Sequence, residues 1–149
     1  MKKNFLFGFA VVMLLVACSK DPEDVIVGTW YNTDNTTEHR VFMLDGEVVS
    51  DESFPIPEST IKWDFREGGT LYVFDSRWNT VDPMAYRYSV NDYYVSIFMP
   101  DGNSEIYEFQ RVKKKEMVLE QRPVAFVDST TVPRRVCITD GHFVFSKKR

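Results

Sequence analysis

The stretch IKWDFREGGTLYVF, residues 61–74, decides the fold class. Apolar side chains, among them Trp63 and Phe65, alternate with charged ones in its first half, which is the two-residue period of a half-buried strand. Gly68 and Gly69 then supply a tight turn, and TLYVF, a second run rich in β-favouring residues, follows. The stretch therefore predicts an antiparallel hairpin with one face in a protein core.

The same pattern recurs further along the chain. YRYSVNDYYVSIFM, residues 86–99, alternates apolar and polar positions around an Asn-Asp turn. EIYEFQRVKKKEMVLEQR, residues 105–122, predicts another hairpin with a solvated turn at residues 113–115. A helix over residues 111–122 is the alternative, but its apolar residues make a poor stripe at 3.6-residue spacing, so we prefer the hairpin.

Loops and turns separate the predicted strands. DESFPIPEST, residues 51–60, holds two prolines that cannot donate to a strand ladder, so we expect a loop there. The loop DSRWNTVDP, residues 75–83, carries an aromatic residue, Trp78. Pairs of Asp and Gly between apolar segments predict three tight turns, at Asp45-Gly46, Asp101-Gly102 and Asp140-Gly141.

The count is about nine to eleven short strands, mostly joined to their sequence neighbours. Such a meander pairs antiparallel, and closing it removes exposed edges. We therefore predict an all-β fold, an antiparallel meander that closes into a β-barrel of about eight to ten strands. A two-sheet sandwich is the alternative.

One face of each strand points into a small barrel, where side chains either fill the interior or line a pocket. In a chain this short we favour a packed interior. We expect the outward aromatic residues to come from the set Tyr86, Tyr94, Phe98, Tyr107 and Trp78. We expect these residues to point inward: Trp63, Phe65, Leu71, Val73, Tyr88, Val95 and Ile97.

The N-terminus carries a targeting pattern. Lys2 and Lys3 precede 13 largely apolar residues, 5–17, a length that suits a secretory signal and falls short of the roughly 20 residues of a membrane-spanning helix. The boundary LVAC, residues 15–18, resembles the lipobox of bacterial lipoproteins. The resemblance implies cleavage before Cys18 and acylation of its thiol, which would attach the protein to a lipid bilayer. An uncleaved anchor and an ordinary secretory signal that contains a cysteine are the alternatives.

These observations divide the chain into a signal peptide at residues 1–17, a polar tether at 18–25 and one folded domain at 26–149. The tether, KDPED after Ser19, resembles the acidic export tethers of Bacteroidetes surface lipoproteins. We expect an outer membrane lipoprotein that faces either the periplasm or the cell surface.

VIVGTWYNTD, residues 25–34, opens the folded part. Gly28 and Trp30 resemble the Gly-x-Trp opening of lipocalins and the wider calycin group, in which the Trp plugs one barrel end under a basic side chain of the last strand. The order of aromatic hairpins over residues 61–122 is similar to that of short lipocalin-like lipoproteins of Bacteroidetes. The classical lipocalin chain is longer and carries a C-terminal helix. Here four basic residues could cover the Trp: Arg134, Arg135, Lys147 and Arg149.

The resemblance implies a lipocalin-like β-barrel that holds a small apolar or amphipathic ligand in its mouth. Trp63, Phe65 and Tyr88 are candidate ligand-binding residues on the strands, and Trp78 is one on a loop. The alternative is a surface module for protein or glycan interaction, or an inhibitor, that uses loops and outer aromatic residues around a filled barrel.

Residues that could carry catalysis are few. His39 and His142 flank opposite predicted hairpins, and neither has the spacing of a zinc site. No Gly-x-Ser-x-Gly elbow or Gly-rich phosphate loop occurs. If Cys18 is acylated, Cys137 has no intramolecular partner, and we expect a buried small apolar residue there. We therefore expect no enzyme activity, no catalytic residues, no metal ion and no cofactor.

Charge is distributed unevenly along the chain. Residues 18–59 carry 2 basic and 10 acidic residues, whereas residues 110–149 carry 10 basic and 4 acidic ones. A basic segment suggests nucleic acid, but an envelope location argues against that partner. We expect instead that the two segments lie near each other in the fold.

Overall fold

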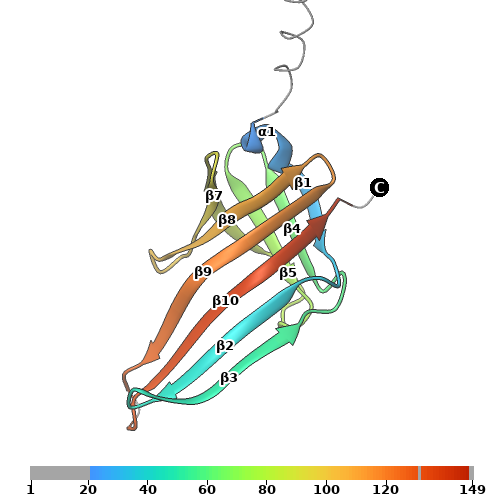
Figure 1. The fold of residues 1–149 in the computed structure, drawn as a ribbon. Helices are drawn as coiled ribbons and strands as arrows, with labels where there is room; N and C mark the ends of the chain where they lie inside the picture. The colour runs from blue at the N-terminus through green and yellow to red at the C-terminus, as the bar shows by residue number, and fades with distance from the viewer. Residues whose placement is uncertain (1–20, 131, 148–149) are drawn as a thin grey trace, which may run out of the picture.

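The computed structural model describes residues 21–130 and 132–147, so the predictions for the signal peptide and Cys18 lie outside the described residues (Figure 1). Residues 22–25 of the expected tether belong to a short helix. The elements are α1 Pro22–Ile26, β1 Gly28–Asn32, β2 Thr37–Leu44, β3 Glu47–Pro55, β4 Ile61–Arg66, β5 Thr70–Asp75, β6 Met84–Val90, β7 Tyr94–Phe98, β8 Ser104–Lys113, β9 Glu116–Asp128 and β10 Arg135–Ser146.

Eight of these strands close into an antiparallel barrel. β1 pairs with β4, each strand from β4 to β9 pairs with the next, and β10 pairs back with β1 through Tyr31 opposite Ser146. The predicted all-β meander barrel is confirmed, and it is consistent with a lipocalin-like barrel. The sandwich alternative is wrong, and so is the helix over residues 111–122, where β8 and β9 form the preferred hairpin.

The β2–β3 hairpin lies outside the barrel wall. β2 pairs with the first part of β10, from Leu44 opposite Arg135 to Thr37 opposite His142. β3 pairs with β2 and forms the free edge of the described sheet. Together with the second half of β9, these strands form a four-stranded sheet that projects from one end of the barrel (Figure 1). We call this sheet the blade; it comprises residues 37–55, 124–128 and 135–140.

Two of the three predicted Asp-Gly turns are confirmed. Asp45-Gly46 joins β2 to β3, and Asp101-Gly102 lies between β7 and β8. Asp45 and Gly46 both have positive φ, 48° and 87°, which matches the right-handed twist of a tight hairpin.

The predicted turn at Asp140-Gly141 is wrong, because both residues lie inside β10. Gly141 faces β9 on one side and β2 on the other, and it is required for close packing rather than for a turn. A Cβ atom there would lie 2.7 Å from a ring carbon of Phe143 and 2.9 Å from the carbonyl oxygen of Thr37. No side chain fits at that position without displacing its neighbours.

The loop predicted over residues 51–60 is wrong in its first half, where β3 continues to Pro55. β3 is an edge strand and Pro55 is its last residue, so the missing N–H removes no bond from the ladder interior. The remainder of the stretch is irregular, as predicted.

One end of the barrel is plugged by Trp30, whose side chain is fully buried. Its indole Nε1 donates a hydrogen bond of 2.6 Å to the carbonyl oxygen of Ile26 in α1. Of the four basic candidates, Lys147 covers the ring, with Nζ 4.6 Å from the ring centroid. The same ammonium group donates to the carbonyl oxygens of Val25 and Val27, at 2.9 and 2.8 Å, and so ties the end of β10 to α1.

The predicted inward residues all face the barrel interior. Six of the seven are buried, and Tyr88 packs its ring against Phe65 with centroids 4.9 Å apart. Phe98 points outward as predicted. The outward assignment of Tyr107 is wrong, since that side chain is only 4% exposed, and Tyr86 also packs against the core. Both alternating sets of β8 side chains contain apolar residues, so periodicity alone could not select the inner set.

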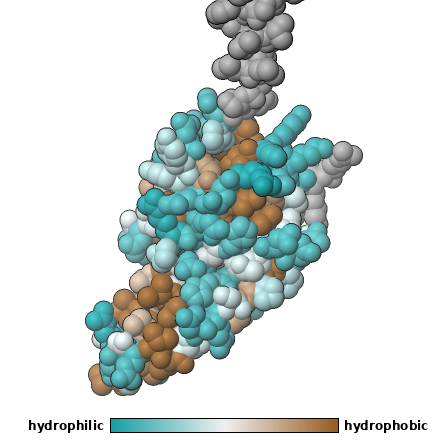
Figure 2. Space-filling model, in the orientation of Figure 1, coloured by the Kyte–Doolittle hydropathy of each residue, from teal (hydrophilic) through white to brown (hydrophobic). Residues whose placement is uncertain are grey.

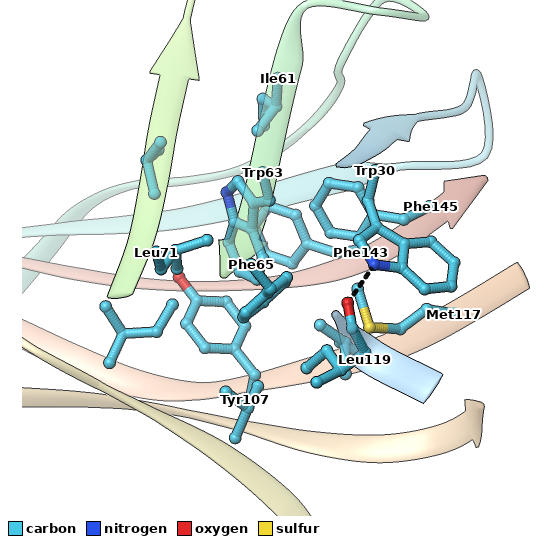
Figure 3. Packing of buried hydrophobic residues seen from close by; sticks show 14 of the residues in the cluster. Trp30, Ile61, Trp63, Phe65, Leu71, Tyr107, Met117, Leu119, Phe143 and Phe145 are labelled. Atoms are coloured by element: carbon cyan, nitrogen blue, oxygen red, sulfur yellow. Dashed lines mark hydrogen bonds between the residues drawn. The ribbon is translucent and has the colours of Figure 1, made fainter. Parts of the chain in front are cut away.

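The interior is packed toward the plugged end, where Trp63 stands at the centre of an aromatic cluster (Figure 3). Its ring centroid lies 4.8 Å from that of Phe145, 5.0 Å from Tyr107, 5.8 Å from Phe65 and 6.2 Å from Phe143. The expectation of a packed interior therefore holds for only part of the barrel. Beyond Trp63 the interior opens.

Candidate functional site

A cavity of about 290 Å³ lies between the aromatic cluster and the base of the blade. Its volume falls at the lower limit of small-molecule sites, which is roughly 300 Å³. The barrel strands supply an apolar floor, and charged side chains from β2, β5, β8 and the β5–β6 loop lie around it. The floor consists of Ile61, Trp63, Val73, Ile97 and Phe143.

An ion-pair network crosses the cavity rim. Arg77, just after β5, donates to Asp75 with a 2.6 Å contact between Nη2 and Oδ2, and to Glu38 of β2 with a 2.9 Å contact between Nη1 and Oε2. Arg40 pairs with the second carboxylate oxygen of Glu38. The hydrogen bonds to Asp75 and, to a lesser extent, to Glu38 raise the pKa of Arg77. The four charges balance, and they bind the blade to the barrel.

A further carboxylate, that of Glu105 on β8, lines the cavity beside this network. It accepts a hydrogen bond of 2.7 Å from the hydroxyl of Tyr107 and a longer one of 3.5 Å from the Gln121 amide. Burial and then the negative charge of Glu105 raise the pKa of Tyr107 well above its ordinary value. The same two causes raise the pKa of Tyr86. The negative charge of Glu105 thus acts on both tyrosines of the cavity.

The structure brings together two of the four predicted ligand-binding residues. Trp63 and Trp78 both line the cavity, the first in the floor and the second, 39% exposed, at the rim. Phe65 lies deeper in the core, toward the plugged end. Tyr88 lines a separate depression beside α1, and its hydroxyl donates to the carbonyl oxygen of Arg66.

The charged residues of the cavity were missed by sequence reasoning. Glu38 and Arg40 sit in a strand that could not be assigned to the rim before its pairing with β10 was known. Asp75 is the last residue of β5, Arg77 follows it, and Glu105 is the second residue of β8, so each has the sequence position of an ordinary solvated residue near a turn. Nothing local in the sequence distinguishes them.

The histidines lie on adjacent strands and do not flank opposite hairpins as predicted. His39 of β2 is opposite Asp140 of β10, with its ring nitrogens 3.1 Å from Asp140 and 2.8 Å from Asp51. These hydrogen bonds, that to Asp51 first, raise the pKa of His39. His142 pairs with Glu120. In residues 21–130 and 132–147, no group of three or more metal-ligating side chains is positioned to hold an ion.

The blade carries exposed apolar side chains. Phe42, Cys137 and Phe126 lie opposite one another across β2, β10 and β9, and the two phenylalanines are 44% and 56% exposed. They line a groove of about 660 Å³ that shares Phe126 with the cavity. Cys137 is half-buried there, not fully buried as predicted. Figure 2 shows apolar surface gathered over the projecting end of the blade.

The fold and the cavity define a class of protein, a closed eight-stranded antiparallel barrel with one plugged end and one open end. In the part of the chain that the structure describes, no helix has the length and apolar character to cross a membrane. No protein-family model, curated protein or solved structure matches the chain.

Proposed function

We propose that this protein is a non-catalytic binding module of the lipocalin-like type that holds a small amphipathic ligand in the open end of its barrel. The observation that carries the proposal is the cavity of about 290 Å³, with an apolar floor and a charged rim. Apolar walls with a few convergent polar groups are typical of small-molecule sites. The charged rim favours a ligand with one polar end over a purely apolar one.

Filling the cavity tests this function. Val73 lies in the floor and is 8% exposed, so Val73→Phe should occupy part of the space that a ligand needs. Val48→Phe is the matched control, because Val48 is 58% exposed on the blade and does not line the cavity. An environment-sensitive apolar dye should bind the unaltered protein and the control, and it should lose affinity for Val73→Phe. Equal binding by all three proteins would contradict the proposed site.

We further propose that the barrel is attached to the outer membrane through acylated Cys18. Three residues span at most about 10 Å, so a lipid at position 18 would hold Asp21 and α1 close to the bilayer. α1 covers the plugged end and the blade projects from the other end, which supports a cavity that faces away from the membrane (Figure 1). Cys18→Ser should leave the protein unprocessed or release it from the membrane fraction, and proteolysis of intact cells would decide between the periplasm and the cell surface.

A second candidate function, protein interaction, is favoured by the blade. Its free edge, β3, carries three acidic residues and no basic one, and two adjacent valines there are more than half exposed. This chemistry fits an extended partner segment with apolar and basic side chains, which would add a strand to the edge. Crosslinking at Val49 tests it: crosslinks to a basic, extended segment would support this function, and the absence of any crosslinked partner in envelope preparations would contradict it.

A further inference from the structure

Among the residues that the structure describes, those that line the cavity carry one more negative charge than positive charge. Arg40 and Arg77 are its two cations, and Glu38 and Asp75 pair with them. Glu105 is the additional carboxylate. Among the described residues, no Lys, Arg or His nitrogen lies within ion-pairing distance of it.

Neutral groups hold this carboxylate in position. The Tyr107 hydroxyl donates to Oε2 at 2.7 Å, and Tyr107 itself is fixed in the core with its ring 5.0 Å from that of Trp63. Glu105 is half-buried, so its charge is only partly solvated. A carboxylate in a partly apolar cavity gains most from a ligand of opposite charge, because that ligand replaces the lost hydration.

The walls around Glu105 are rich in aromatic residues. Faces of aromatic rings attract cations through the ring quadrupole, and quaternary and protonated amines are recognised in this way. Neither arginine is available for an anion, since both already bind carboxylates. Six aromatic residues of the described part of the chain line the cavity: Trp63, Trp78, Tyr86, Tyr107, Phe126 and Phe143.

We propose that the ligand of this cavity is an organic cation, whose ammonium group pairs with Glu105 and whose apolar body packs among the aromatic rings. The inference rests on the proposed binding function and specifies its ligand class. A bare metal ion fits poorly, because the described residues provide no cluster of three metal-ligating side chains.

Three probes of similar size and different charge test the inference on the unaltered protein: 2-phenylethylammonium, 2-phenylethanol and 3-phenylpropionate. We expect calorimetric titration to give a Kd for the cation that is at least about tenfold lower than for the alcohol, as one charge-assisted hydrogen bond permits. The anion should bind most weakly. Equal affinity for the cation and the alcohol would overturn the inference while leaving the proposed function intact, whereas failure of all three probes to bind would overturn both.

Glu105→Gln keeps an oxygen that can accept from Tyr107 but removes the charge. It should abolish most of the preference for the cation and leave the affinity for 2-phenylethanol within about threefold of its original value. Glu108→Gln is the matched control: Glu108 lies on the same strand, but it pairs with Arg122 and does not line the cavity. If Glu108→Gln weakened cation binding as much as Glu105→Gln, the preference would come from overall charge and the inference would fail.

Discussion

The plugged end of the barrel offers a direct test of how the chain termini hold the fold together. Lys147→Met removes an ammonium group and retains a flexible apolar side chain of similar length. The Nζ atom of Lys147 donates to the carbonyl oxygens of Val25 and Val27 and lies 4.6 Å from the ring centroid of Trp30. The substitution therefore removes three contacts at once and leaves two carbonyl groups to be satisfied by water.

The loss in unfolding free energy that we expect for Lys147→Met follows from those three contacts. Hydrogen bonds that involve a charged group contribute about 1.5–3 kcal/mol each, and a cation over an aromatic face contributes about 0.5–2 kcal/mol. Lys147 is half-buried, and burial lowers its pKa, which shows that desolvation of the charge opposes these gains. We therefore expect a net loss of about 2 kcal/mol in the free energy of unfolding. For a domain of this size that corresponds to a decrease of about 6–10 °C in Tm.

Thermal unfolding, monitored by circular dichroism, measures the decrease in Tm that Lys147→Met should cause. Lys113→Met is the matched control, because Lys113 is exposed at the end of β8 and the substitution is the same. Its unfolding free energy should stay within about 0.5 kcal/mol of that of the unaltered protein. If both variants unfold at the same temperature, the Lys147 ammonium does not stabilise the plugged end.

Two further predictions concern β10 and its neighbour β2. Gly141→Ala should destabilise the protein by about 1–3 kcal/mol, seen as a lower Tm, because the new Cβ would overlap Phe143 and a backbone carbonyl that cannot rotate away; an unchanged Tm would contradict the packing. NMR titration should give His39 a pKa above the ordinary value of about 6.5. Because Asp51 and Asp140 favour protonated His39, its contribution to stability should be complete below pH ~6.5 and be lost as the pH rises through the raised pKa. A pKa at or below 6.5, or a His39→Gln variant with the same dependence of stability on pH, would refute this.

Local patterns predicted most of the barrel because its pairings are local. The Gly68-Gly69 hairpin and its successors connect neighbouring strands, and alternation along β4 and β5 is enough to fix which face of that hairpin is buried. The blade could not be predicted in this way. Thr37 pairs with His142 across more than a hundred residues, and no short-range signal marks either strand for the other. The acidic and basic segments of the chain do meet there, as charge alone indicated.

The candidate site was predictable only in its aromatic part. Trp63 stood out by periodicity and Trp78 by its loop, and both line the cavity. The contact between Arg77 and Glu38 joins residues 39 positions apart. It depends on the pairing of β2 with β10, which no local sequence pattern predicts. Tyr107 was misplaced because β8 offers apolar residues in both registers, and the choice between them is made by the neighbouring strands.

Inner residues of the long strands β9 and β10 determine both the packing of the barrel and the shape of the candidate site. Phe143 faces the interior from β10, and Gly141 is the next residue of β10 on the same face. Gln121 lies opposite Gly141 in β9. The ring of Phe143, which forms part of the cavity floor, packs over Gly141, where a Cβ atom would lie only 2.7 Å from a ring carbon. The same absence of a Cβ lets β2 approach β10 closely, and the residue that β2 places opposite Gly141 is Glu38, the centre of the rim network. A side chain at position 141 should therefore disturb the cavity floor and the rim together, because its Cβ would press on the ring of Phe143 and on the β2 backbone next to Glu38.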